Sequence, residues 1–92
     1  MAKSKPWYVY QGVNHAWREI YYGASPRPRS RIDGKHCRGG TKTLAHWNCR
    51  KERPEWRKVS IHPDRASASA EAHRLEKSVP PPGYKIIQTG GT

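Results

Sequence analysis

Residues 7–23 read WYVYQGVNHAWREIYYG, and their pattern sets the architecture that the rest of the chain can adopt. Aromatic and β-branched residues are concentrated at 7–10 and 17–22, as they are in strands. Turn-forming residues at 12–15 lie between these two runs, and Gly23 ends the second. The segment is therefore predicted to form an antiparallel hairpin with a loop of about four residues.

Prolines shape the segment that follows the hairpin. Pro26 and Pro28 interrupt the chain, so any helix that follows them starts late and is short. Residues 41–50 are predicted to form a helix because Leu44 and Trp47 lie three apart on one of its faces.

The last third of the chain holds the clearest helical pattern. Apolar residues recur there at intervals of four, three and four, at Ala68, Ala72, Leu75 and Val79. Residues 56–61, before this helix, alternate as a third strand does, and residues 84–87 suit a last short strand.

These elements predict one α+β domain over residues 1–92, with its core at 7–87 and flexible ends at 1–5 and 88–92. We expect a small, mainly antiparallel three-stranded sheet that begins with the hairpin and is flanked by two or three helices. The apolar residues expected in the core are Trp7, Val9, Trp17, Ile20, Leu44, Val59, Leu75 and Ile86.

The charge balance favours a polyanionic partner. The chain has 92 residues and a formal net charge of +11, and residues 26–58 carry eleven Lys and Arg against three acids. Such a charge on a small chain favours nucleic acid, because phosphates neutralised by Lys and Arg release counterions. No apolar run approaches the ~20 residues of a membrane span, and no secretory signal is evident, so we expect a cytoplasmic protein with no membrane partner.

Two tyrosine-rich motifs flank the hairpin turn, Tyr8-Val9-Tyr10 and Tyr21-Tyr22-Gly23, and the later helix contains AEAHRLE at 70–76. In this order and spacing the motifs resemble the GIY-YIG nuclease family, which has two such strands, an arginine-bearing helix and a helix of the form E-A-x-x-x-E. The resemblance covers about residues 7–87. The chain departs from the family pattern at Tyr8, Val9, Tyr22 and Lys85.

The resemblance implies an endonuclease that hydrolyses phosphodiester bonds, on DNA in preference to RNA, with Mg²⁺ or Mn²⁺ as cofactor. Tyr10 and Tyr21 would be the base and its hydrogen-bond partner. Arg31, eight residues beyond Gly23, would hold phosphate oxygens through its planar fork. Glu76 would hold the metal, since Mg²⁺ needs only one or two protein carboxylates.

The residues themselves leave alternatives open. Glu71 fits the helical pattern as well as Glu76 does, and Arg27 or Arg29 could take the place of Arg31. His36 follows closely and is a candidate second general base or phosphate contact.

The basic segment supplies the candidate nucleic-acid contacts, which are Arg27, Arg29, Arg38, Lys42 and Arg50. The same basic cleft would also serve a non-catalytic DNA- or RNA-binding module, and a third possibility is a basic structural protein bound to RNA or to an acidic partner. The sequence sets no oligomeric state.

Four possible metal ligands lie within fourteen residues: His36, Cys37, His46 and Cys49. Their spacing raises the question of zinc, but adjacent His36 and Cys37 are poorly placed to ligate one tetrahedral ion, and no CxxC pair is present. We therefore expect free thiols, in preference to zinc or to a disulfide in an intracellular chain.

Overall fold

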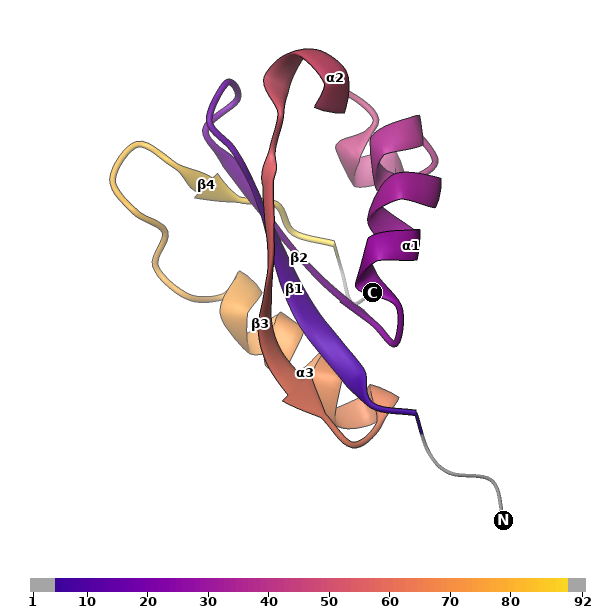
Figure 1. Ribbon diagram of the computed structural model, residues 1–92. Helices are drawn as coiled ribbons and strands as arrows, with labels where there is room; N and C mark the ends of the chain where they lie inside the picture. Colours follow the sequence, from indigo (N-terminus) through magenta and orange to yellow (C-terminus); the bar gives the residue numbers. More distant parts are fainter. Residues whose placement is uncertain (1–4, 90–92) are drawn as a thin grey trace.

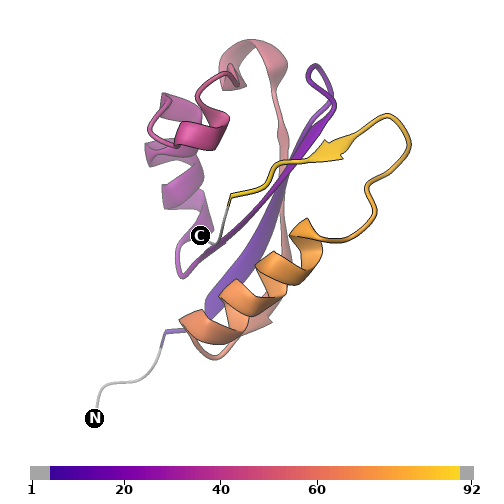
Figure 2. The same cartoon turned by 180° about the vertical axis from the view of Figure 1, so that it is seen from behind.

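The computed structural model describes residues 5–89 and contains a four-stranded sheet with helices on both sides (Figures 1 and 2). In chain order its elements are β1 (Trp7–Asn14), β2 (Glu19–Ser25), α1 (Pro28–Gly34), the 3-10 turns η1 (His36–Arg38) and η2 (Lys42–Leu44), α2 (Cys49–Glu52), β3 (Glu55–His62), α3 (Arg65–Glu76) and β4 (Lys85–Ile86).

The sheet has the order β3-β1-β2-β4. β1 pairs antiparallel with both β2 and β3, whereas β4 pairs parallel with β2 through Ile20 and Ile86. The α+β class is confirmed, and the expected three-stranded sheet is corrected to a mixed sheet of four strands.

The hairpin forms where the sequence predicts it, but its strands are longer and its turn lies later. The β1–β2 register runs from Tyr8 opposite Ser25 to Asn14 opposite Glu19. The Oδ1 atom of Asn14 accepts hydrogen bonds from the backbone N–H groups of Ala16 (3.0 Å) and Trp17 (3.2 Å), which fixes the turn at this point.

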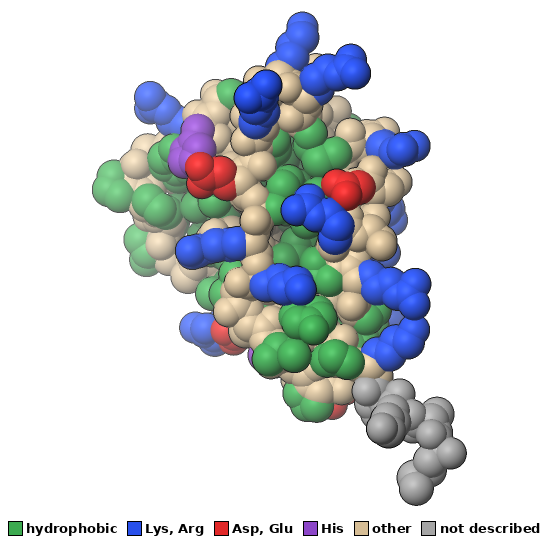
Figure 3. All heavy atoms as spheres, viewed as in Figure 1, with side chains coloured by type: hydrophobic (Ala, Val, Ile, Leu, Met, Phe, Trp, Pro, Cys, Tyr) green, Lys and Arg blue, Asp and Glu red, His purple; other side chains and the backbone are tan. Residues whose placement is uncertain are grey.

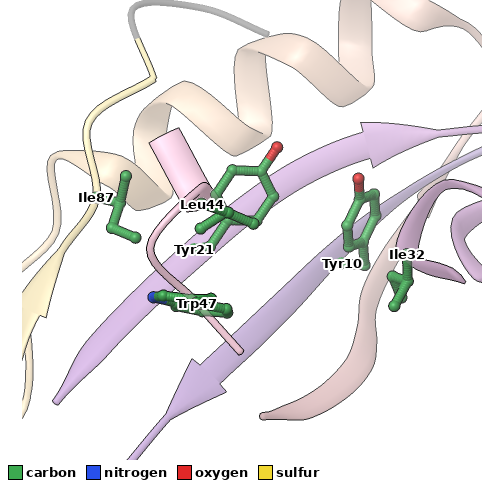
Figure 4. Close-up of a cluster of buried hydrophobic side chains, with 6 residues drawn as sticks. All are labelled: Tyr10, Tyr21, Ile32, Leu44, Trp47 and Ile87. Carbon is green, nitrogen blue, oxygen red and sulfur yellow. The ribbon is translucent and has the colours of Figure 1, made fainter. Parts of the chain in front are cut away.

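Successive residues of β1 point to opposite faces and join two separate cores. One core lies under α1 and the loops that follow it, and contains Tyr10, Tyr21, Ile32, Leu44, Trp47 and Ile87 (Figure 4). The other lies under α3, where Val9 packs against Ala68 and Ala72. The tyrosines of the site described below belong to the first of these cores.

Three predicted core residues are wrong. Trp17 lies in the hairpin turn and is 49% exposed. Val59 is passed over in the β1–β3 pairing, where Val9 faces Ser60 and Tyr10 faces Lys58, so it sits in a bulge and is 39% exposed. In the last strand Ile87, rather than Ile86, joins the core.

The predicted helix over 41–50 is also wrong. Asn48 is extended and starts a new helix by accepting a hydrogen bond from the Lys51 N–H (3.1 Å). The segment therefore consists of the 3-10 turn η2 and the one-turn helix α2, separated by residues 45–48.

The expectation of free thiols is wrong as well, because Cys37 and Cys49 form a disulfide. The two residues are twelve apart in sequence, but the turns between them bring their Cα atoms to 5.4 Å, within the usual range for a disulfide.

The C-terminal segment, expected to be flexible over 88–92, forms hydrogen bonds where the structure describes it. Gln88 and Thr89 are held by hydrogen bonds to Glu76, whereas the expected flexibility of 1–4 and 90–92 lies outside the described residues. Within the described part of the chain, each helix is too short or too polar to span a bilayer.

Candidate active site

The two motif tyrosines lie side by side on neighbouring strands. Tyr10 of β1 and Tyr21 of β2 have ring centroids 6.3 Å apart, and Figure 4 shows both hydroxyls at the same side of the sheet. Tyr10 lies directly over Gly23, where a Cβ would come within 2.5 Å of its Cζ. The last glycine of the second motif is therefore required by the ring above it.

His36 connects to this pair from η1. Its Nε2 lies 2.5 Å from the Tyr10 hydroxyl, and its Nδ1 lies 2.5 Å from Oγ1 of Thr41. The imidazole stacks on Trp56 of β3 with a centroid separation of 5.7 Å and an angle of 10° between the rings. Both ring nitrogens thus have partners, and the imidazole is held in one orientation.

Arg31 lies on the middle of α1, with an exposed side chain whose charge reaches the cluster. Burial raises the pKa of the Tyr10 hydroxyl and that of the Tyr21 hydroxyl, and the positive charge of Arg31 only partly opposes this. Burial, followed by the charges of Arg31 and Lys35, lowers the pKa of His36 to about 4. At neutral pH the imidazole and both phenols are therefore uncharged.

Glu76 ends α3 and is buried next to the C-terminal segment. Its Oε1 accepts from the Thr89 N–H (3.2 Å) and its Oε2 from the Thr89 hydroxyl (2.6 Å). Burial is the main cause of the raised pKa of Tyr21, and the negative charge of Glu76 adds a smaller contribution in the same direction.

Two of the alternatives that the sequence left open, Glu71 and Arg29, are held in ion pairs. Glu71 is bound by both Nε and Nη2 of Arg74, at 2.7 and 2.6 Å, on the outer side of α3. Arg29 forms an ion pair with Asp33 one turn further along α1 (3.5 Å). Hydrogen-bond and ring contacts thus bring together Tyr10, Tyr21 and His36, and the charges of Arg31 and Glu76 act on this cluster.

The predicted nucleic-acid contacts are all exposed, on α1, α2 and the turns between them, and they are Arg27, Arg29, Arg38, Lys42 and Arg50. Figure 3 shows Lys and Arg side chains spread over one face around a strip of hydrophobic side chains. A hollow of about 170 Å³ on α1 and β3 has an aromatic and aliphatic floor and a basic rim, formed by Tyr10, Ile32, Trp56, Arg29, Arg57 and Lys58.

Sequence reasoning missed the residues that support the site. Thr41 and Trp56 hold His36 in place, and Thr89 holds the Glu76 carboxylate. No motif marks them. Arg65 also went unnoticed, although its spacing of eleven residues from Glu76 places both on one side of α3.

The donor set fits a hard divalent cation. The described residues contain no cluster of three or more His, Cys, Asp or Glu side chains that would hold a metal ion. Mg²⁺ retains most of its water and takes one or two protein carboxylates, so a single carboxylate such as that of Glu76 is chemically compatible with this ion.

The sequence matches the GIY-YIG catalytic domain family over residues 6–85, which is most of the chain. The protein therefore belongs to the GIY-YIG family, a nuclease-type family whose members generally act on nucleic acid. No curated protein and no solved structure matches the chain significantly.

Proposed function

We propose that the protein is a metal-dependent endonuclease that hydrolyses phosphodiester bonds in DNA. The observation that carries this proposal is the cluster of Tyr10, Tyr21 and His36, on which the charges of Arg31 and Glu76 act, within the stretch that matches the family. The net charge of +11 supports a nucleic acid as the substrate.

Arg31 would bind a phosphate group of the substrate. Its side chain is exposed, and its guanidinium presents paired N–H donors that match two oxygens of one phosphate. Its charge would stabilise the negative charge that develops on these oxygens as the nucleophile attacks.

The Tyr10–His36 pair would handle the proton of the attacking water. Because His36 is neutral above about pH 4, its Nε2 can accept the Tyr10 hydroxyl proton while Nδ1–H donates to Thr41. The Tyr10 oxygen would take a proton from water as it passes its own to Nε2, so neither phenolate nor free hydroxide has to form. Tyr21 would orient the Tyr10 hydroxyl.

Glu76 would hold Mg²⁺ or Mn²⁺, which when bound supplies Lewis-acid stabilisation of the phosphoryl oxygens. The contribution of the chain is a carboxylate fixed by two hydrogen bonds from Thr89. Each carboxylate oxygen has a second lone pair, so these bonds leave the group able to bind a cation.

One observation favours the non-catalytic binding module as a second candidate. Tyr10, Tyr21 and Glu76 are only 1%, 2% and 6% exposed, so the substrate reaches them after a local rearrangement or not at all. In the second case Arg31 and the surface cations would bind nucleic acid without cutting it.

Nicking of supercoiled plasmid in Mg²⁺ or Mn²⁺ tests the proposal. Glu76→Gln should abolish cleavage, because an amide is a poor ligand for a hard cation, and Arg31→Ala should cost roughly 2–4 kcal/mol of transition-state stabilisation. Glu71→Gln is the matched control on the same helix and should cut like the wild type.

Two outcomes would contradict the proposal in different ways. Equal cleavage by the wild type and Glu76→Gln removes Glu76 from the site. Absence of cleavage by the wild type on duplex, single-stranded and branched DNA, with binding retained, assigns the protein to the binding class.

A further inference from the structure

A second hollow is lined in part by Arg31 and does not include Tyr10 among its lining residues. It has a volume of about 200 Å³ and lies between the end of β2, the start of α1 and the first turns of α3. Its lining includes Trp7, Ala24, Pro26, Arg31, Arg65 and Ser69. Arg31 therefore faces both the tyrosine cluster and this hollow.

Among the described residues, the charged side chains that line the hollow are both positive. No acidic side chain is among its lining residues in the described part of the chain. Within residues 5–89, the ion pairs of Arg29 with Asp33 and of Arg74 with Glu71 have no counterpart at Arg31 or Arg65. Two guanidinium groups without a carboxylate are a suitable receptor for a phosphodiester.

The hollow also has an aromatic wall. The ring of Trp7 is partly exposed, and the guanidinium carbon of Arg65 lies 6.0 Å from the ring centroid. A flat indole beside a cation is the arrangement on which single nucleotides stack, and Ala24 and Pro26 add small apolar surfaces.

A neighbouring hollow extends the basic surface past Arg31. It is lined in part by Arg27 and Lys35, and it shares Ser25, Pro26 and Arg31 with the first. Basic side chains thus continue on both sides of Arg31, as expected for a surface that follows a nucleic-acid backbone.

We propose that the Trp7–Arg65 hollow binds the nucleotide next to the phosphate held by Arg31, with Arg65 on its phosphate and Trp7 against its sugar or base. The assignment of the central phosphate to Arg31 rests on the proposed function. The hollow itself needs no metal, so its occupancy is measurable without cleavage.

The test is an NMR titration of ¹⁵N-labelled wild type with the dinucleotide pdTdT in EDTA. The indole N–H signal of Trp7, assigned with Trp7→Phe, should shift on binding, while that of Trp17 in the hairpin turn should stay in place. Arg65→Gln should weaken binding at least fivefold. Arg65→Lys keeps the charge but loses the planar guanidinium, so its affinity should lie between that of the wild type and that of Arg65→Gln.

Arg74→Gln is the matched control, since it removes the same charge from the same helix on the side paired with Glu71. It should bind within twofold of the wild type. Equal affinities of Arg65→Gln and Arg74→Gln, an unmoved Trp7 signal, or no binding at 10 mM dinucleotide would each overturn the subsite. Binding at Trp7 by a wild type that cuts no plasmid would overturn the nuclease proposal and leave this subsite standing.

Discussion

The imidazole of His36 is 2% exposed, and each of its nitrogens has a partner, Tyr10 on one side and Thr41 on the other. Protonation of this buried histidine is unfavourable, because the charged ring would be removed from water and would lie near the positive charges of Arg31 and Lys35. The residue therefore links the stability of the fold to pH.

We predict that the free energy of unfolding falls as the pH drops from about 6.5 to about 4. The pKa of His36 is lowered from 6.5 to about 4 in the folded protein, so the unfolded chain takes up this proton first. Stability is retained above pH 6.5 and is lost toward pH 4, by on the order of 3 kcal/mol. Urea unfolding at several pH values measures the slope.

His36→Gln is the control for this linkage. The lowered pKa values of Glu52, Asp64 and Glu71 also reduce stability in acid, but equally in both proteins. A wild-type slope as shallow as that of His36→Gln would show that the histidine is not held neutral.

At the scale of single residues, the helical pattern predicts which residue types belong to the candidate site but does not distinguish between two positions that fit equally well. Glu71 and Glu76 flank the same apolar stripe of α3, and only the path of the C-terminal segment distinguishes them. Thr89 reaches Glu76, whereas Arg74 neutralises Glu71. That segment was expected to be flexible, so its part in the site could not be predicted.

Among the elements, the β1–β2 hairpin carries the tightest packing constraint of the site. A methyl group at position 23 would lie 2.5 Å from Cζ and 2.6 Å from the hydroxyl oxygen of Tyr10. Either the ring or the strand would have to move, and the Tyr10–His36 contact would change with it.

We predict that Gly23→Ala costs about 1–3 kcal/mol, the usual range for overpacking, and disrupts the Tyr10–His36 pair. Gly34→Ala, where nothing lies within 4 Å, should be neutral or slightly stabilising. Urea unfolding gives both values, and the nicking assay reports the site. A Gly23→Ala protein as stable and as active as Gly34→Ala would refute the constraint.

Elements with a strong local pattern were predictable, and those set by distant contacts were not. The hairpin, the short α1, the third strand and α3 are confirmed, because alternation, proline placement and helical spacing are local. Within residues 41–50 the Asn48 cap starts a separate helix, which the spacing of Leu44 and Trp47 does not indicate. The last short strand was predicted, but its parallel pairing with β2, which makes the sheet four-stranded, was not. Val59 is exposed because a bulge changes the register, and the alternating pattern does not indicate a bulge.

For the whole molecule, charge is the dominant property. The net charge is +11, and Figure 3 shows many Lys and Arg side chains spread over one face. Among the described residues, Arg29 and Arg74 are the only Lys or Arg side chains in ion pairs. Binding to DNA should therefore be driven mainly by counterion release.

We predict that the affinity for duplex DNA in EDTA falls with a log–log salt slope of about −4 to −5, as for some five neutralised phosphates. Fluorescence anisotropy between 50 and 300 mM KCl measures it. Arg38→Ala and Lys42→Ala should weaken binding to all sequences alike. An affinity almost independent of salt would contradict a phosphate-contacting surface.

The Cys37–Cys49 bond makes the assay buffer part of the experiment. It closes the loop that carries Thr41, and closing a loop of this length adds about 3 kcal/mol in the chain-entropy account, which matters in so small a domain. Dithiothreitol, routine in nuclease buffers and lysis mixtures, can open such a bond by thiol exchange. A preparation kept in reductant and one purified without it would then differ in how firmly His36 is held. Their activities are comparable only when the oxidation state of the two cysteines has been measured in both.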